Sequence, residues 1–309
     1  MRVIIPGSSG FIGRNLLTKI PPNWDTTAIY NSDENFPSFI KSLNTDKIIT
    51  KRCNLLNFSD LRSLQKNCGH QYDLCIYLAA NSDPIKSNID PSFDLRSNTE
   101  SLTNFLQTFN IERFIFFSSG AVYEGHEDVV SPEVCVSPTL PYAISKLASE
   151  AYVRYFKRKG VLSEYLIVRF FGAYGPYESP RKIFTKLIKQ FYFKRNEEFL
   201  IRGNGLNLID AMYIDDVIEG IIKMANMPLM DSVIDFCGGS PLTIKDLVIK
   251  VANIFSITKP KIIHKGETVE YNKFFANPLP FLHQYDFKPK INLTEGIKKL
   301  ARFLEEKRR

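Results

Sequence analysis

The sequence predicts an α/β fold in which a doubly wound parallel sheet is joined to a smaller, interleaved C-terminal lobe. The chain opens with an apolar run at 3–5, a glycine-rich turn and a helix that stops before Pro21. Strand-like and helix-like segments then alternate, which is typical of strands joined by crossover helices. The run 73–78 is apolar almost throughout, as expected for a parallel strand that is buried on both faces.

The turn at 7–13 carries Gly7, Gly10 and Gly13 in a G-x-x-G-x-x-G spacing. Its place between a strand and a helix is the setting of a dinucleotide-binding turn. We expect Gly7 to form the tight turn, Gly10 to let backbone N–H groups approach a pyrophosphate, and Gly13 to let helix and strand pack closely. The positive end of the helix then favours the anion. The alternative is a glycine-rich turn that binds no nucleotide.

Composition favours a globular enzyme. With 309 residues, of which 44% are hydrophobic and 24% charged, the chain can build a full core and two unequal lobes. No apolar run is long enough to cross a bilayer, and Arg2 leads straight into a strand, so we expect neither a signal peptide nor a membrane partner.

Cysteine, histidine and charge usage exclude other classes of protein. The five cysteines show no C-x-x-C spacing and the four histidines are scattered, so we expect reduced thiols, a cytoplasmic location and no metal site. The net charge of +7 is spread over helix faces, which favours a phosphate-bearing small substrate over nucleic acid.

The second and third predicted strands, 26–30 and 47–50, each lead into polar residues. Asn31 follows the second strand, where a dinucleotide fold usually carries an acid that binds the adenosine ribose. That acid is displaced or absent, and Arg14 is available for a 2′-phosphate, so both NAD and NADP stay open as cofactors. After the third strand, Asn54 and its neighbour either approach the adenine or form a plain polar loop.

Small residues follow the next two strands. The strand 73–78 ends in two alanines, and the fifth strand, 113–117, runs into Ser118 and Ser119. A helix is predicted between them, over 97–109. Because ligands of open α/β sheets bind beyond the carboxyl ends of the strands, we expect these ends and the glycine turn to share one site.

Tyr142 and Lys146 are four residues apart in a helix predicted from about 142 to 157, so they share one helical face. A phenol has a reference pKa of about 10, and a nearby ammonium favours its ionised form. Such a tyrosine can take the proton of a sugar hydroxyl while hydride leaves the same carbon. Ser119 is expected to hydrogen-bond the same oxygen. The alternative is a solvated Tyr/Lys pair with no catalytic role.

The region beyond residue 167 mixes completion of the sheet with a second lobe. Its predicted elements are strands at 163–171 and 233–237 and helices at 180–193, 215–227 and 243–255, the last capped by Thr243. We therefore expect a dinucleotide-binding domain over 1–167 plus about 206–240, and a substrate lobe over 168–205 and 241–309.

These motifs together resemble a known family, the extended short-chain dehydrogenase/reductases, in their nucleotide-sugar epimerase/dehydratase branch. The segments that carry the resemblance are Gly7-x-x-Gly10-x-x-Gly13, Leu78-Ala79-Ala80, Asn98, 118–123, Tyr142-x-x-x-Lys146, 169–176 and 213–217. The resemblance implies a Rossmann-type fold, an NAD or NADP cofactor, and tyrosine-dependent redox chemistry at a sugar carbinol with Ser119, Tyr142 and Lys146 as the catalytic set. It also implies a nucleotide-sugar substrate, a role in polysaccharide biosynthesis, and a homodimer formed through helices near 92–109 and 142–159.

The binding residues follow from the motifs and the resemblance. The residues expected to bind the cofactor are Gly7, Ser9, Gly10, Phe11, Ile12, Gly13, Asn31, Asn54, Leu55, Leu78, Ala79, Ala80, Asn98, Ser118, Tyr142, Lys146 and Phe171. The residues expected to bind the substrate are Ser82, Gly120, Ala121, Gly172, Arg181, Lys182 and Arg202.

Two departures from the family bear on the substrate. Gly172 stands where the family often has Asn, and Ile209 where it often has Arg; neither can bind a pyrophosphate through its side chain. Arg181, Lys182 and Arg202 are candidates to supply the missing charge, or else they are ordinary surface charges.

The reaction type is predicted from Gly120 and Ala121. Dehydratases of the family usually carry an acid pair there, so the usual 4,6-dehydratase design is disfavoured. The sequence favours an epimerase similar to UDP-glucose 4-epimerase. The alternatives are an NADPH-dependent nucleotide-4-keto-sugar reductase, a dehydratase, and a catalytically inactive cofactor-binding regulator.

Overall fold

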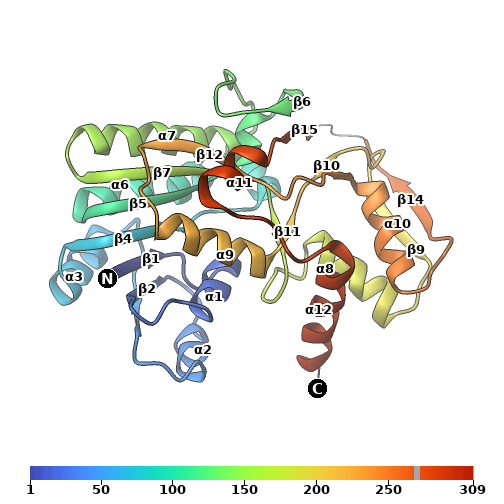
Figure 1. The fold of residues 1–309 in the computed structure, drawn as a ribbon, viewed down its shortest axis with the longest axis horizontal. Coiled ribbons are helices and arrows are strands. Elements are labelled where there is room, and N and C mark those ends of the chain that lie inside the picture. The colour runs from blue at the N-terminus through green and yellow to red at the C-terminus, as the bar shows by residue number, and fades with distance from the viewer. Residues whose placement is uncertain (268–271, 309) are drawn as a thin grey trace. The chain divides into compact units, whose positions relative to one another are not determined.

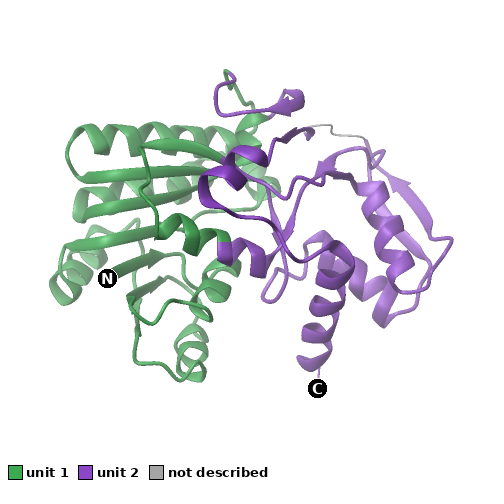
Figure 2. Cartoon of the chain, viewed as in Figure 1, with its two compact units in different colours: residues 1–123, 135–170, 220–234 green, residues 124–134, 171–219, 235–309 purple. Residues whose placement is uncertain are grey.

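The computed structural model describes residues 1–267 and 272–308. Residues 268–271 and Arg309, which the sequence assigns to the substrate lobe, lie outside the described part. The described chain divides into two compact units (Figure 2): unit 1 comprises 1–123, 135–170 and 220–234, and unit 2 comprises 124–134, 171–219 and the rest from 235 on. The domain boundaries expected from the sequence stay a prediction.

Unit 1 is built around a parallel sheet. Over the described residues the sheet has seven strands in the order β12-β7-β5-β4-β1-β2-β3 (Figure 1). They are β1 (Arg2–Pro6), β2 (Asp25–Tyr30), β3 (Ile48–Arg52), β4 (Gln71–Tyr77), β5 (Asn110–Ser119), β7 (Leu162–Phe170) and β12 (Ser232–Phe236). The strand order reverses beside β1, since β2 and β3 lie on one side of it and β4 and β5 on the other. The predicted doubly wound sheet is confirmed.

Helices connect these strands. They are α1 (Phe11–Leu17), α2 (Phe36–Ser42), α3 (Phe58–Cys68), α4 (Pro84–Ile89), α5 (Pro91–Leu95), the π-helical turn η1 (Arg96–Glu100), α6 (Ser101–Thr108), the 3₁₀ turn η2 (Gly120–Tyr123), α7 (Pro141–Arg158) and α9 (Ile214–Ala225), which runs from residues of unit 2 into unit 1.

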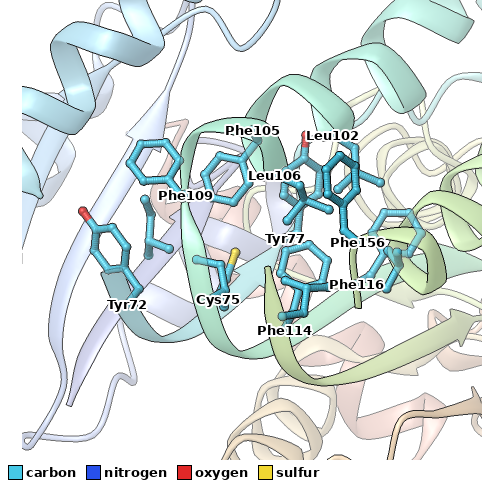
Figure 3. Packing of buried hydrophobic residues seen from close by; sticks show 14 of the residues in the cluster. Tyr72, Cys75, Tyr77, Leu102, Phe105, Leu106, Phe109, Phe114, Phe116 and Phe156 are labelled. Carbon is cyan, nitrogen blue, oxygen red and sulfur yellow. The ribbon is translucent and has the colours of Figure 1, made fainter. Parts of the chain in front are cut away.

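The two faces of the sheet are both buried, because alternate residues of each strand point to opposite sides. On one face, aromatic rings of α6 pack on those of β4 and β5 (Figure 3). Tyr77 is central there: its ring centroid lies 5.5 Å from that of Phe105, and its hydroxyl is 3.1 Å from the Ser101 Oγ. The alternate residues Ile5 and Ile76 are fully buried as well, so both faces are covered. This explains the continuous apolar runs of the sequence.

Backbone contact fixes the glycine turn. Gly7 has a φ of +86°, and a Cβ there would lie 2.5 Å from the Ala79 backbone N. A Cβ on Gly13 would lie 2.5 Å from the Ser8 backbone O. Gly13 thus packs against the turn that follows β1, its expected role in packing helix against strand stays a prediction, and no side chain fits at either position without moving the backbone.

Unit 2 consists of short strand pairs and helices. Its strands are β6 (Glu127–Val130), β8 (Ala173–Tyr174), β9 (Glu198–Arg202), β10 (Leu208–Ile209), β11 (Met212–Tyr213), β13 (Leu242–Thr243), β14 (Lys261–Lys265) and β15 (Lys273–Ala276). They pair as β6 with β15, β8 with β11, β9 with β14, and β10 with β13. Its helices are α8 (Ile183–Ile188), the π-helical turn η3 (Lys189–Phe193), α10 (Ile244–Ile254), α11 (Leu279–Tyr285) and α12 (Leu293–Glu306).

Several element boundaries differ from the sequence prediction. The helix expected over 97–109 starts one residue earlier as a π-helical turn, because α5 runs directly into it. The helix expected from 180 starts only at Ile183, because Lys182 is extended with ψ of 154°. The predicted N-cap is confirmed: the Thr243 hydroxyl oxygen accepts a hydrogen bond from the Asp246 backbone N–H at 3.0 Å.

The described residues contain no helix that is long and apolar enough to span a bilayer. Nor do they contain a group of three or more His, Cys, Asp or Glu side chains that could hold a metal ion. All five cysteines lie in this part of the chain and are free thiols.

Candidate active site

The carboxyl ends of β1, β4 and β5 form the edge at which the site lies. These strands are neighbours in the parallel sheet, so their ends meet at one edge. The glycine turn follows β1, and its approach to Ala79 brings it against the end of β4. Ser119 ends β5. The structure thus brings together the three segments that the sequence placed at strand ends.

Ser119 and Tyr142 meet at this edge. The Tyr142 side chain, half-buried in the first turn of α7, hydrogen-bonds the side chain of Ser119. Burial raises the pKa of Tyr142, the bond to Ser119 opposes that rise, and the charge of Asp94 adds to it. In the chain by itself, removal of the phenolate from water is the larger effect, and the ionised form that the ammonium and a bound nicotinamide are expected to favour stays a prediction.

Lys146 lies one turn further along α7 and is 4% exposed. Its Nζ donates a hydrogen bond of 2.5 Å to the Phe117 backbone O and lies 4.7 Å from the centre of the Phe116 ring. Burial lowers the pKa of Lys146 to about 8, against the nearby charges of Glu150 and Asp94, which raise it. An amine with this pKa is still protonated at neutral pH but not strongly basic.

A buried ion pair supports the same helix. Glu150 on α7 accepts hydrogen bonds from the Arg169 Nε at 3.1 Å and Nη2 at 2.9 Å, and from the Ser118 Oγ at 2.6 Å. The side chains of Glu150 and Arg169 are 0% and 4% exposed. The Arg169 guanidinium also lies 4.9 Å from the Tyr123 ring centre. Together these contacts fix α7 against β5 and β7.

A second buried network joins α5 and η1 to the first turns of α7. Asp94 is fully buried and accepts hydrogen bonds from Asn81, Asn98 and Ser145. The Asn98 carboxamide also accepts the Asn81 backbone N–H at 2.7 Å. This network connects the loop after β4 to the residue that precedes Lys146.

Arg14 and Asp33 form an ion pair beside the glycine turn. The Arg14 Nη2 lies 2.5 Å from the Asp33 Oδ2, and its guanidinium lies 4.5 Å from the Phe39 ring centre. Asp33 comes 20 residues after Gly13, the separation at which dinucleotide folds carry the acid for the adenosine ribose. Asp33, two residues beyond Asn31, is therefore the candidate for the displaced acid, and its contact with the ribose stays a prediction.

Comparison with protein families decides the identity. The model of the NAD dependent epimerase/dehydratase family matches residues 3–232, most of the chain. The chain belongs to this family. The recognition made from the glycine turn and the Tyr/Lys spacing is confirmed.

Individual relatives span the whole chain. An uncharacterized UDP-glucose epimerase of Bacillus subtilis (strain 168) is 27% identical over 96% of this chain and 96% of its own. The dTDP-D-glucose 4,6-dehydratase of Mus musculus is 25% identical over 96% of this chain and 87% of its own. The solved structure of UDP-glucuronic acid 4-epimerase from Bacillus cereus, in complex with UDP-glucuronic acid and NAD, has a TM-score of 0.86 at 23% identity and covers 99% of both chains.

The family is described as NAD dependent, so the glycine turn can be examined for its fit to a dinucleotide. Close backbone contacts at Gly7 and Gly13 hold the turn tightly, and it leads into the N-terminal N–H groups of α1. A tight turn that leads into a helix N-terminus fits the pyrophosphate of a dinucleotide. Ser9 lies in the turn, and Phe11 and Ile12 begin α1; their contact with the cofactor stays a prediction.

The other residues expected at the cofactor are divided among several segments. Leu78 donates its backbone N–H to Pro6 at 2.9 Å, so the end of β4 is fixed to the end of β1. Asn54 uses its side-chain oxygen in a local turn, accepting from the Leu56 N–H at 3.1 Å. Leu55 is buried, and Asn31 is exposed at the end of β2. The roles of these residues stay predictions.

The residues expected at the substrate fall in both units. Ser82, Gly120 and Ala121 belong to unit 1, where the Ala121 N–H donates to the Ser119 Oγ at 3.1 Å. The remaining ones lie in unit 2, as does the cofactor candidate Phe171; they are Gly172, Arg181, Lys182 and Arg202. All three of the basic side chains in this set are exposed.

Backbone conformation accounts for the family departure at Gly172. Its φ is +150°, and a Cβ there would lie 3.4 Å from the Ala211 Cβ. Its carbonyl also accepts the Met212 N–H at 3.1 Å where β8 pairs with β11. The 3.4 Å contact with the Ala211 Cβ is an ordinary distance, so it is the backbone conformation, strained for any L side chain, that disfavours the asparagine common in the family.

The sequence analysis gave no role to Asp94, Glu150 or Arg169. A signal existed for Glu150, since it lies four residues after Lys146 and thus on the same helical face. Asp94 and Arg169 carried no such signal, because only the packing of α5 and β7 against α7 buries their charges.

Proposed function

We propose that this protein is an NAD(P)-dependent nucleotide-sugar epimerase that resembles UDP-glucose 4-epimerase. The observation that carries the proposal is the hydrogen bond between Ser119 and Tyr142, with the buried Lys146 amine one turn away, at the edge of the sheet where the glycine turn lies. Relatives named as UDP-sugar 4-epimerases support the substrate class.

The three side chains have separate tasks in the proposed reaction. Tyr142 accepts the proton of the sugar hydroxyl at the carbon that is oxidised and returns it after reduction. Ser119 hydrogen-bonds the same oxygen and stabilises the charge that develops there. Lys146, as an ammonium, offsets the cost that burial imposes on the phenolate of Tyr142.

The cofactor is proposed to be NAD or NADP, held at the glycine turn. When bound, the nicotinamide supplies the acceptor and donor of hydride. The chain's own contribution is the tight turn that Gly7 and Gly13 allow, the N–H groups at the start of α1, and the Arg14–Asp33 pair near the expected ribose position.

Epimerisation is favoured over dehydration because Gly120 and Ala121 provide no acid or base after Ser119. The nearest carboxylate along the chain, Glu124, belongs to unit 2. The second candidate is a dehydratase, which is favoured by the similarity to the mouse dTDP-D-glucose 4,6-dehydratase. A reductase that uses NADPH is the third.

The nucleotide of the substrate is proposed to bind through positive charge from unit 2. Gly172 and Ile209 cannot hold a pyrophosphate with their side chains, so Arg181, Lys182 and Arg202 are proposed in their place. A role in polysaccharide biosynthesis and a cytoplasmic location are also proposed, the latter supported by the five free thiols, all of which lie in the described residues.

A homodimer is proposed through α7 and the α5–α6 segment. Three large apolar side chains of α7 are exposed at helical spacing, Ile144 at 46%, Tyr152 at 44% and Tyr155 at 42%, and Leu95 of α5 is 51% exposed. Such a row on a long helix is typical of a helix-packing interface.

The substitution Tyr142→Phe tests the proposal. With UDP-glucose as substrate and NAD added, we expect kcat to fall by at least about 100-fold, because the general base is lost. Interconversion of UDP-glucose and UDP-galactose is measured by chromatography, and NAD binding and the thermal unfolding curve are expected to stay unchanged. A variant that binds NAD and turns over substrate as fast as the wild type would refute the catalytic role of Tyr142. The remaining hypothesis would then be a catalytically inactive, cofactor-binding regulator.

A further inference from the structure

Asp94 is a carboxylate with no contact to solvent, at 0% exposure, in the short helix α5. It accepts hydrogen bonds from the Ser145 Oγ at 2.6 Å, the Asn81 Nδ2 at 2.7 Å and the Asn98 Nδ2 at 3.1 Å. All three of these donors are neutral. Burial of a carboxylate costs several kcal/mol in order of magnitude unless its charge is balanced. The presence of an acidic residue at this buried position therefore requires an explanation.

The three donors come from different elements. Asn81 lies in the loop after β4, Asn98 in η1, and Ser145 in the first turns of α7. Ser145 also donates to the Tyr142 backbone O at 3.0 Å and precedes Lys146. Asp94 therefore connects the carboxyl end of β4 directly to the turn of α7 that carries both catalytic candidates.

The groups around the Lys146 amine show which of the nearby carboxylates is left to act on it. On α7 itself, Glu150 faces the amine, but its carboxylate is already bound by Arg169 of β7. From β5 come the Phe117 carbonyl and the Phe116 ring, both neutral. From α5 comes Asp94, whose negative charge acts on both Lys146 and Tyr142. Tyr123 of η2 is engaged with Arg169. Of the two carboxylates that act on the amine, Asp94 is thus the one whose hydrogen-bond partners in the described part of the chain are all neutral.

We infer that Asp94 is a positioning residue that fixes the first turns of α7 at the strand ends and, through its negative charge, helps to hold a proton on the Lys146 amine. The inference rests on the proposed function, because the ammonium matters only if Tyr142 acts as the base. The negative charge of Asp94 also disfavours the Tyr142 phenolate. Asp94 is therefore expected to increase activity only at pH values at which Lys146 would lose its proton without it.

The first experiment measures the amine without any substrate. The full chain is labelled with ¹⁵N-lysine, the Lys146 signal is assigned with Lys146→Arg, and the amine is titrated by NMR in wild type and in Asp94→Asn. We expect the pKa of Lys146 to be lower in the variant than in wild type. At pH values above both pKa values, each unit of this decrease reduces the ammonium fraction about tenfold. An unchanged titration overturns the inference.

Matched controls separate charge from position. Asp90→Asn removes an exposed carboxylate four residues away, at the N-cap of α5, and is expected to leave the Lys146 titration unchanged. Ser145→Ala removes the 2.6 Å link but keeps the Asp94 charge, so it is expected to lower kcat for UDP-glucose equally at all pH values with KM retained. If Asp94→Asn does not fold, Ser145→Ala alone still decides: wild-type kcat in it overturns the positioning role.

The second experiment measures the pH dependence of turnover. The ratio of kcat in Asp94→Asn to that in wild type is expected to fall by about tenfold for each unit by which the amine pKa drops, between pH 7 and pH 9. A ratio that is constant over this range contradicts the inference, since a purely structural defect lowers both equally. If the wild type does not turn over UDP-glucose, the proposed function fails while the NMR titration still decides the role of Asp94.

Discussion

Tyr142 and Lys146 lie one helical turn apart, and burial moves their pKa values in opposite directions. It raises that of the phenol and lowers that of the amine to about 8, because in each case the charged form is the one that loses water. The two pKa values, which nearly coincide for the free side chains, therefore move apart in the folded chain, and at neutral pH the phenol stays neutral while the amine is still mostly protonated.

The buried pair of Glu150 and Arg169 makes a stability prediction at the same scale. Glu150→Gln leaves the Arg169 guanidinium buried and uncompensated, so we expect the free energy of unfolding to fall by about 3–5 kcal/mol. Urea unfolding followed by fluorescence of Trp24, the one tryptophan of the sequence, reports on unit 1, where it is fully buried.

The control is an exposed pair in the same unit. The Asp25 and Lys47 side chains, 3.1 Å apart, are 65% and 42% exposed. Asp25→Asn is expected to change the same free energy far less than Glu150→Gln does, because water screens an exposed pair. Equal losses in both variants would show that burial of the Glu150–Arg169 pair is not what makes it important.

Among the elements, we expect the connection from α1 to the end of β2 to determine whether NAD or NADP is preferred. The Arg14 guanidinium is engaged by Asp33, and their side chains are 15% and 32% exposed. While this ion pair is formed, the Asp33 carboxylate can still accept hydrogen bonds from the ribose hydroxyls, but the Arg14 guanidinium is not available to bind a 2′-phosphate. We therefore expect wild type to bind NAD more tightly than NADP.

Asp33→Asn tests this preference. The released guanidinium can then bind the 2′-phosphate, so the affinity for NADP relative to NAD is expected to rise by about tenfold. Calorimetric titration with each cofactor measures the ratio. Glu34→Gln, which changes the adjacent exposed carboxylate, is expected to leave the ratio unchanged. An equal ratio in Asp33→Asn and wild type would mean that the pair is only structural.

At the scale of the whole molecule, the two units each have their own pH response. In unit 2, burial raises the pKa of Glu178 from 4.5 to about 7, although its carboxylate accepts a hydrogen bond from the Thr185 Oγ1 at 3.0 Å. The folded chain then binds more protons than the unfolded chain between these values. The stability that Glu178 contributes is therefore lost as pH rises from about 4.5 to about 7.

Hydrogen exchange resolves this effect by segment. We expect exchange in α8, corrected for the intrinsic rate, to be faster at pH 8 than at pH 5 in wild type, and Glu178→Gln to remove most of the difference. Glu197→Gln, an exposed acid in the same unit, is expected to behave as wild type. A pH dependence that persists in Glu178→Gln would assign it to other groups.

The assembly makes the other prediction at this scale. Ile144→Glu combined with Tyr152→Glu places charges on the exposed face of α7 and is expected to weaken dimerisation by at least about 30-fold, since an interface anchor contributes about 2 kcal/mol. Sedimentation velocity over a range of protein concentrations measures the effect. Leu200→Lys, at an exposed apolar position in unit 2, is the control. A monomeric wild type would refute the proposed interface.

The sequence by itself determined the sheet, the glycine turn and the Tyr142/Lys146 pair. These depend on local rules: apolar runs for buried strands, glycines where a Cβ collides with backbone, and i,i+4 spacing on a helix. Their physical causes lie within a few residues of the chain, so the pattern of residues is enough to predict them.

Only the tertiary structure decided which charges are buried and what they face. Asp94 and Arg169 look like ordinary charged residues in the sequence. Glu150 shares a helical face with Lys146 and Asp33 lies 20 residues after Gly13, but neither pattern shows what these charges contact. Their importance arises when α5, β7 and α1 pack against other elements and remove water from the carboxylates and guanidinium groups. Burial and partner distance are properties of the packed chain, and they set both the direction of each pKa shift and the cost of each missing partner.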